Sequence, residues 1–150
     1  MRIDGWQVDG FGVLKDFERR GLQPGVTVLL GENEAGKSTL LAFLRAVLFG
    51  FPDGRSRVPT TYEPVFGGRH GGRLFVRDAD DGLWTLQRYA DERKTVGVTR
   101  PDGSAGSPAD LTALLGGADG QLFRNVFAFG LDELQAFETL SDESVSERIF

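Results

Sequence analysis

The stretch VTVLLGENEAGKSTLLAFLRAVLFGF, residues 26 to 51, decides the fold. It opens on a continuous apolar run, Val26 to Leu30, which follows a Pro-Gly pair and is typical of a buried parallel strand. After an intervening loop, apolar residues recur from Leu40 to Leu48 at helical spacing. Gly50 and Pro52 are suited to end that helix. The stretch therefore predicts a strand, a tight loop and a helix in direct succession.

The loop GENEAGKST matches the Walker A pattern G-x-x-x-x-G-K-[ST] through Gly31, Gly36, Lys37 and Ser38. Glycines let the backbone curl so that N–H groups point at phosphate oxygens, and the helix that follows adds its positive N-terminal dipole. Lys37 is placed to reach the β- and γ-phosphates, Ser38 to ligate Mg²⁺, and Thr39 to support the α-phosphate. A chance match is the alternative in a chain with 21 Gly. The strand before the loop and the helix after it favour the first interpretation, a site for ATP with Mg²⁺.

Composition narrows the class of protein. The 150 residues, 40% of them hydrophobic and 12 of them Phe, suit one globular domain. The first 75 residues carry 10 Lys/Arg and 8 Asp/Glu, whereas the rest carry 7 and 14, so the chain is not a free-standing basic nucleic-acid binder. Cys is absent, no apolar run approaches the ~20 residues of a membrane span, and the start has no signal-peptide core. A cytoplasmic protein is expected.

Several further elements are expected on either side of the loop. Two short strands precede it, and a β-hairpin, a further strand and short helices follow it. A helix start is clearest at Ser107, because Pro108 can occupy its first position and Asp110 lies three residues after Ser107. By residue range, the other expectations are strands over 3–11 and 12–21, a loop over 53–72, a hairpin over 72–89 around DADDG, a strand over 95–99, and helices beginning at Asp119 and Ser141.

Three segments besides the loop carry a family resemblance. They are YEP at 62–64, GGRHGGRL at 67–74 and FRNVFAFGLDELQ at 123–135. With GxNExGKS, they make the chain resemble the N-terminal ATPase segment of YhaN-type AAA proteins, which belong with the SMC-like DNA repair and recombination ATPases. The resemblance implies an α/β P-loop NTPase fold, the first lobe of an ABC-type head with an antiparallel β-subdomain. Residues 1–150 are then expected to be the N-terminal lobe of a longer coiled-coil protein.

The same resemblance implies a mechanism and partners. Two heads would sandwich two ATP molecules, so the expected partners are a second head in a homodimer, the missing C-terminal lobe and DNA, with a nuclease left open. The nucleotide-binding residues carried over are Gly31, Asn33, Gly36, Lys37, Ser38 and Thr39. Asp132 and Glu133 fall in the segment where the family has its Q-loop and are candidate catalytic residues beside Lys37. Phe129 stands where many relatives have Gln, and the acidic pair is also suited to the first turn of a helix.

Hydrolysis requires parts that the sequence does not supply. LFVRDAD at 74–80 has Arg77 within the strand and Ala79 where the general base should be, so it is rejected as a Walker B motif. No SGG-type signature loop occurs, and His70 is interpreted as a solvated loop residue. We therefore expect ATP hydrolysis in the full-length protein and almost none from this chain alone. The alternatives are a nucleotide-gated scaffold or dimerisation module without turnover, and a P-loop small-molecule kinase.

Basic residues outside the loop have two interpretations. Arg55, Arg57, Arg69 and Arg73 lie near Tyr62 and Phe66, an arrangement that suits contact with nucleotide or DNA phosphates. The favoured alternative is a solvent-exposed loop in which arginine supplies solubility. Arg2 and Lys15 are weaker candidates for presenting positive charge to the nucleotide.

Overall fold

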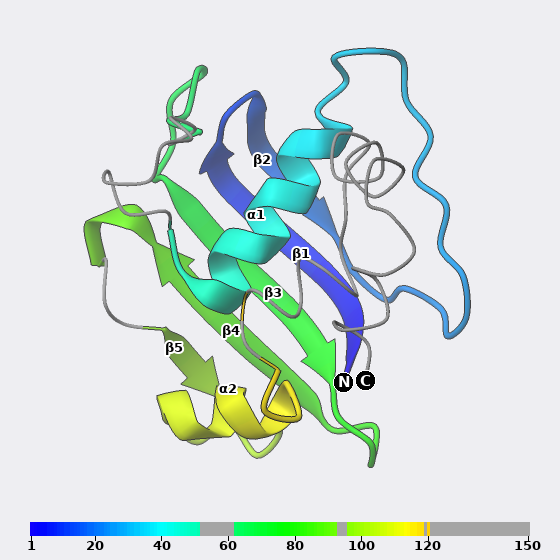
Figure 1. Ribbon diagram of the computed structural model, residues 1–150, viewed down its shortest axis with the longest axis vertical. Helices are drawn as coiled ribbons and strands as arrows, with labels where there is room; N and C mark the ends of the chain where they lie inside the picture. Colours follow the sequence, from blue (N-terminus) through cyan, green and yellow to red (C-terminus); the bar gives the residue numbers. More distant parts are fainter. Residues whose placement is uncertain (52–61, 93–95, 119, 121–150) are drawn as a thin grey trace, which may run out of the picture. The chain divides into compact units, whose positions relative to one another are not determined.

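The computed structural model describes residues 1–51, 62–92, 96–118 and 120. The chain divides into two compact units, Met1–Gly120 and Gln121–Phe150, and every described residue belongs to the first. The elements of this unit, shown in Figure 1, are β1 (Arg2–Phe11), β2 (Leu14–Arg19), α1 (Lys37–Phe49), β3 (Gly71–Arg77), β4 (Leu83–Tyr89), the 3₁₀ turn η1 (Ala90–Glu92), β5 (Gly97–Thr99) and α2 (Pro108–Leu114).

The five strands form one sheet in the order β2-β1-β3-β4-β5, and each neighbouring pair is antiparallel. Trp6, Leu74, Leu86 and Val98 stand opposite one another across four strands, and each is 6% exposed or less. Alternate residues of a strand share a face, so this row marks the face of the sheet that is buried. The strands predicted within 3–11, 12–21 and 95–99 are confirmed as β1, β2 and β5. The predicted hairpin and the antiparallel β-subdomain are confirmed as well.

Helix α1 covers that buried face. Figure 1 shows it lying across the sheet, and Arg88, which shares the face of Leu86, donates from Nε to the Val47 carbonyl at 3.0 Å. Phe43 is fully buried and meets the Phe11 ring edge-on at a centroid distance of 5.5 Å. Burying one such side chain stabilises the fold by roughly 1.5–3 kcal/mol. The helix ends at Gly50, as the sequence predicts.

The second helix, α2, packs beside β5 at the end of the strand order. Ser107 adopts an extended backbone before α2, Pro108 takes the first helical position, and the Ser107 N–H donates to Asp110 Oδ2 at 2.7 Å. The Gly106 N–H donates to the Val98 carbonyl at 2.7 Å, which joins this turn to β5. The helix start predicted at Ser107 is confirmed.

The prediction of a buried parallel strand at 26–30 is wrong for this structure. The segment forms no strand, and Val26 and Leu30 are 94% and 92% exposed. The physical reason is pairing, because a strand is buried only when a neighbour meets its backbone groups and covers its side chains. Every strand in the described part of the chain is antiparallel and belongs to the sheet above.

Several expectations lie outside the described residues. They are the helices beginning at Asp119 and Ser141, the 53–61 part of the long loop with Arg55 and Arg57, and the acidic pair Asp132 and Glu133. The described end of that long loop, residues 62–70, has no regular secondary structure, as expected.

Candidate nucleotide-binding site

The candidate site begins where the glycine-containing loop meets α1. Gly36 precedes the helix in the left-handed conformation, with φ 88°, and no side chain caps the helix start. The first turn also contains no acidic residue. The first N–H groups of a helix have no partner within the helix, and together with the helix dipole they favour an anion. The arrangement is therefore suited to a phosphate.

The turn between β1 and β2 supports this loop. A Cβ atom at Gly36 would lie 2.9 Å from Leu14 Cδ2, and one at Gly12 would lie 2.9 Å from Thr39 Cγ2. Gly12 is fixed in turn by the Tyr62 segment, because its N–H donates to the Tyr62 carbonyl at 2.7 Å. Sequence reasoning missed Gly12, Leu14 and Tyr62 as supports of the loop; the turn residues DGFG at 9–12 were a local signal for Gly12, and the YEP segment at 62–64 was one for Tyr62.

The Lys37 ammonium lies within the loop. Its Nζ donates to the carbonyl oxygens of Gly31 at 2.7 Å and Glu32 at 2.6 Å. Two bonds to neutral carbonyls orient the positive charge without neutralising it, since a carbonyl carries only a partial charge. The geometry thus brings Gly31 and Lys37 together and holds a cation beside the start of α1.

The other predicted site residues lie along the same loop. Asn33 and Ser38 are exposed, and within the described ranges neither side chain makes a hydrogen bond; Thr39 is half-buried against Gly12. Among the described residues no group of three or more His, Cys, Asp or Glu could hold a metal ion. A bound phosphate would supply further oxygen ligands to a cation at Ser38, which is how Mg²⁺ is commonly held.

His70 is not the solvated residue expected from the sequence. Its ring lies among aromatic rings, 5.3 Å from Phe11 and 4.9 Å from Phe51 between centroids, and its Nε2 is buried without a hydrogen-bond partner. Burial lowers the pKa of His70, and the charge of Glu63 opposes that effect. The aromatic partners are Phe11 of β1 and Phe51, which follows the C-cap of α1, so tertiary contact decides this environment.

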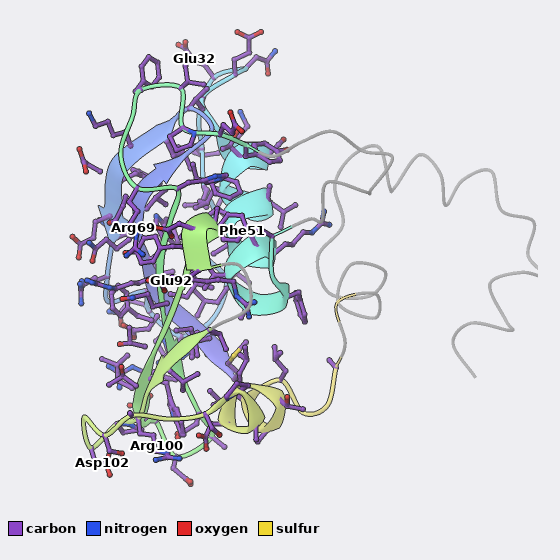
Figure 2. All side chains as sticks on the ribbon, turned by 90° about the vertical axis from the view of Figure 1, so that its left-hand side faces the viewer. Glu32, Phe51, Arg69, Glu92, Arg100 and Asp102 are labelled. Atoms are coloured by element: carbon purple, nitrogen blue, oxygen red, sulfur yellow. The ribbon has the colours of Figure 1, made fainter. Side chains whose placement is uncertain are left out.

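Of the candidate basic residues that the structure describes, Arg69 and Arg2 make their contacts away from the loop, and one residue is an exception. Arg69 pairs with Asp91 and with Glu92, and its guanidinium lies 3.8 Å from the Tyr89 ring centroid; Arg69 and Glu92 are labelled in Figure 2. Arg2, at the start of β1, donates to the Leu22 carbonyl and pairs with Asp81, so it lies at the end of the strand away from Gly12.

Lys15 is the exception among these basic residues. It is exposed and follows Leu14, which contacts Gly36. Of the two weaker candidates, Lys15 is therefore the one whose strand begins beside the loop.

An antiparallel sheet covered by a helix that starts from such a loop defines the class, an α/β P-loop domain of the ABC-type head. Comparison with known proteins agrees. Residues 1–138 match the family described as AAA domain, and the chain belongs to that family. It is 33% identical over 115 residues to the uncharacterised protein YhaN of Bacillus subtilis (strain 168), a match that covers 75% of this chain and 11% of YhaN. The chain is thus of the YhaN type, and it spans about a tenth of that relative.

A solved structure supports the fold. It comes from work described as "Structural biochemistry of ATP-driven dimerization and DNA stimulated activation of SMC ATPases", and it matches with a TM-score of 0.64 at 13% identity. The match covers 97% of this chain and 96% of that one. At this identity the likeness establishes the fold alone. Within the described residues, no helix is both long enough and apolar enough to cross a membrane.

Proposed function

We propose that this chain is the ATP-binding lobe of an SMC-like ATPase acting in the cytoplasm on DNA, in repair, recombination or chromosome maintenance. The proposal that the chain binds ATP is supported chiefly by the position of the Lys37 ammonium. The Gly31 and Glu32 carbonyls hold it beside an uncapped helix start. The Lys37 ammonium and the unpaired N–H groups at the start of α1 lie together, and their positive charge is suited to binding a polyphosphate. Family membership supports the same conclusion.

Each residue of the loop has a role under this proposal. The open N–H groups at the start of α1 bind phosphate oxygens, and the left-handed Gly36 lets the loop turn into the helix. Lys37 exchanges its carbonyl partners for phosphate oxygens and offsets their negative charge. Ser38 offers its exposed hydroxyl to Mg²⁺. The metal supplies charge neutralisation on the phosphates, and Asn33 and Thr39 line the remainder of the loop.

Calorimetric titration with ATP and Mg²⁺ tests the site. Lys37→Ala removes one charge-assisted contact, so ATP should bind about tenfold or more weakly. Ser38→Ala should weaken binding chiefly when Mg²⁺ is present. Arg19→Ala is the matched control, because it removes an equal charge from the end of β2 that lies away from the loop and should change affinity far less. Unchanged binding in Lys37→Ala would place the nucleotide elsewhere.

We also propose that Val26–Leu30 forms its strand with the second lobe of the head. The support is the exposure of four apolar residues of this run, at 94%, 70%, 48% and 92% for Val26, Val28, Leu29 and Leu30. Such a run pairs readily with another strand and is costly to leave in water. In hydrogen exchange, amides 26–30 should gain protection when the second lobe is added, while amides of β3 should change little. Equal rates with and without that lobe would contradict the pairing.

Dimerisation and hydrolysis belong to the complete protein under this proposal. Two heads would close on ATP, and DNA would stimulate turnover; the solved relative's description, ATP-driven dimerisation and DNA-stimulated activation, is the support. Sedimentation with and without ATP and a phosphate-release assay with and without DNA test these steps. Dimerisation without phosphate release would favour the scaffold instead. Acceptor-dependent ADP formation would favour the kinase.

A further inference from the structure

The face of the sheet opposite α1 contains a shallow hollow of about 480 Å³. Phe75 of β3, Thr85 of β4 and Gly97 and Thr99 of β5 line it together with Arg73 and Arg20. Arg73, Phe75, Thr85 and Thr99 belong to the strand positions that alternate with Leu74, Leu86 and Val98, so they lie on the face away from the helix. The volume is within the range of small-molecule sites, roughly 300–1,000 Å³.

Small residues on β4 and β5 leave the hollow open. Thr85 stands opposite Thr99, and Gln87 stands opposite Gly97, which has no side chain to fill the space. A Cβ at Gly97 would meet its nearest atom, Gln87 Cβ, at 3.4 Å, an ordinary contact. Phe75 contributes a ring that is only 4% exposed. A larger side chain at position 97 could therefore occupy the hollow without backbone strain.

Arg73 brings an unneutralised charge to this hollow. Its Nε donates to Gln87 Oε1 at 2.8 Å and its NH1 is 3.5 Å from Gln7 Oε1, and both acceptors are neutral amides. The half-buried Arg73 has no carboxylate partner within the described residues. Two amide oxygens orient the guanidinium and leave its full charge for an anion.

The neighbouring arginines of the same face are neutralised. Arg69 pairs with Asp91 and Glu92, and Arg77 pairs with Asp4 and Asp81. Asp91 and Glu92 outnumber Arg69, and Asp4 and Asp81 balance Arg77 and Arg2, so these groups offer no net positive charge to a long polyanion laid across the sheet. The face therefore suits a compact anion at Arg73 better than a nucleic acid.

Arg20 supplies a second guanidinium. Its Cζ lies 3.8 Å from the centroid of the Phe75 ring, a cation–π contact that places it over the floor of the hollow. It also pairs with Glu18, and both side chains are about half exposed. Because the Glu18 carboxylate partly neutralises Arg20, Arg73 contributes more of the attraction for an anion.

We propose that this hollow binds the phosphate group of a small phosphomonoester, with Arg73 and Arg20 as the charged donors and Thr85 and Thr99 as hydroxyl donors. Guanidinium groups match phosphate oxygens in geometry and charge, and hydroxyls supply further donors. The site is separate from the loop at Gly31–Thr39, which leads into the helix on the opposite face. It does not depend on the proposed ATPase function.

NMR titration of the full 150-residue chain with inorganic phosphate tests the proposal, in a Lys37→Ala background that weakens competition from the loop. The amides of Thr85, Gly97 and Thr99 should shift together. Arg73→Gln should weaken this binding about tenfold or more, since it removes the principal charge. Arg69→Gln is the matched control, because it removes an equal charge from the same face where carboxylates already neutralise it.

Gly97→Glu gives a second variant that keeps the fold free of strain. It places a carboxylate and a larger side chain at the hollow and should abolish the shifts. Shifts confined to residues 36–39, or equal weakening by Arg69→Gln and Arg73→Gln, would overturn the proposal. A single-stranded oligonucleotide that displaces phosphate and binds the hollow more tightly than a small phosphomonoester would overturn it as well, by making the face a nucleic-acid surface.

Discussion

The sheet and the segment that leads to the phosphate loop differ in where their apolar residues lie. Val8, Leu74, Val76 and Leu86 of the sheet are 0% exposed, whereas Val26 and Leu30 before the loop are more than 90% exposed. Both segments are rich in residues that favour strands. The difference is the partner, because β1 and β3 have neighbours on both sides and 26–30 has none among the described residues. The sheet therefore carries stability, and the loop segment is available for binding and association.

The largest expected effect comes from removing matched side chains in the two regions. Leu74→Ala should reduce the free energy of unfolding by about 2–5 kcal/mol, since it leaves a cavity in the core. Leu30→Ala should change it by no more than about 0.5 kcal/mol, since that side chain is 92% exposed. Urea denaturation of both variants measures the contrast. Equal losses would mean that residues 26–30 are buried in solution.

Gly36→Ala should have the next largest effect, because this glycine joins the two regions. A left-handed alanine costs about 1–2 kcal/mol, and the new Cβ would press on Leu14 Cδ2 and weaken ATP binding. Gly21→Ala is the matched control: Gly21 is also left-handed, with φ 68°, but a Cβ there meets no atom within 4 Å. Denaturation and ATP titration of both should show similar stability losses and an affinity loss in Gly36→Ala alone. The same affinity loss in both would refute the role of Leu14.

His70→Phe should give a smaller gain in stability. The buried Nε2 has no partner, and replacing it by an apolar atom should stabilise the fold by about 1 kcal/mol. Burial puts the folded pKa of His70 below its ordinary value of 6.5, so its neutral form contributes stability fully above that value. This contribution is lost as the pH falls through 6.5 toward the folded pKa. Denaturation from pH 7 to pH 5 should show a shallower decline in His70→Phe, and identical slopes would contradict burial.

The smallest expected effect concerns the partly exposed ion pair between Asp4 of β1 and Arg77 at the end of β3. Arg77 Nε donates to Asp4 Oδ1 at 2.8 Å, and this hydrogen bond lowers the pKa of Asp4 below its ordinary 3.8 in spite of burial. A lowered folded pKa means that the stabilisation is fully present above about pH 4 and disappears as the pH falls through the folded value. Asp4→Asn should remove this part of the acid sensitivity. Acid denaturation that is unchanged in Asp4→Asn would argue against it.

Local patterns predicted much of the fold. The hairpin around DADDG follows from alternation and turn residues, and α1 and α2 follow from helical spacing with Gly50 and Ser107 at their boundaries. The loop residues from Gly31 to Thr39 follow from a motif whose chemistry is local. These features depend on residues within a few positions of one another, which is why one sequence suffices to predict them.

Contacts distant in sequence could not be predicted in this way. His70 lies among Phe11 and Phe51, and Gly36 contacts Leu14, across separations that no local pattern records. Arg73 was grouped with loop arginines, yet it belongs to β3 and lies in a hollow that residues of β4 and β5 also line. Which charges are neutralised was likewise decided by the strand order.

The sequence by itself determined the Walker A motif, the helix after it, the hairpin and the family resemblance, because each depends on neighbouring residues in the chain. Only the tertiary structure decided the strand order β2-β1-β3-β4-β5, the aromatic surroundings of His70 and the exposure of Val26–Leu30. The physical reason is that burial is a property of pairs of segments. The composition of an apolar run favours its burial. Which surface covers the run depends on the other segments that pack against it.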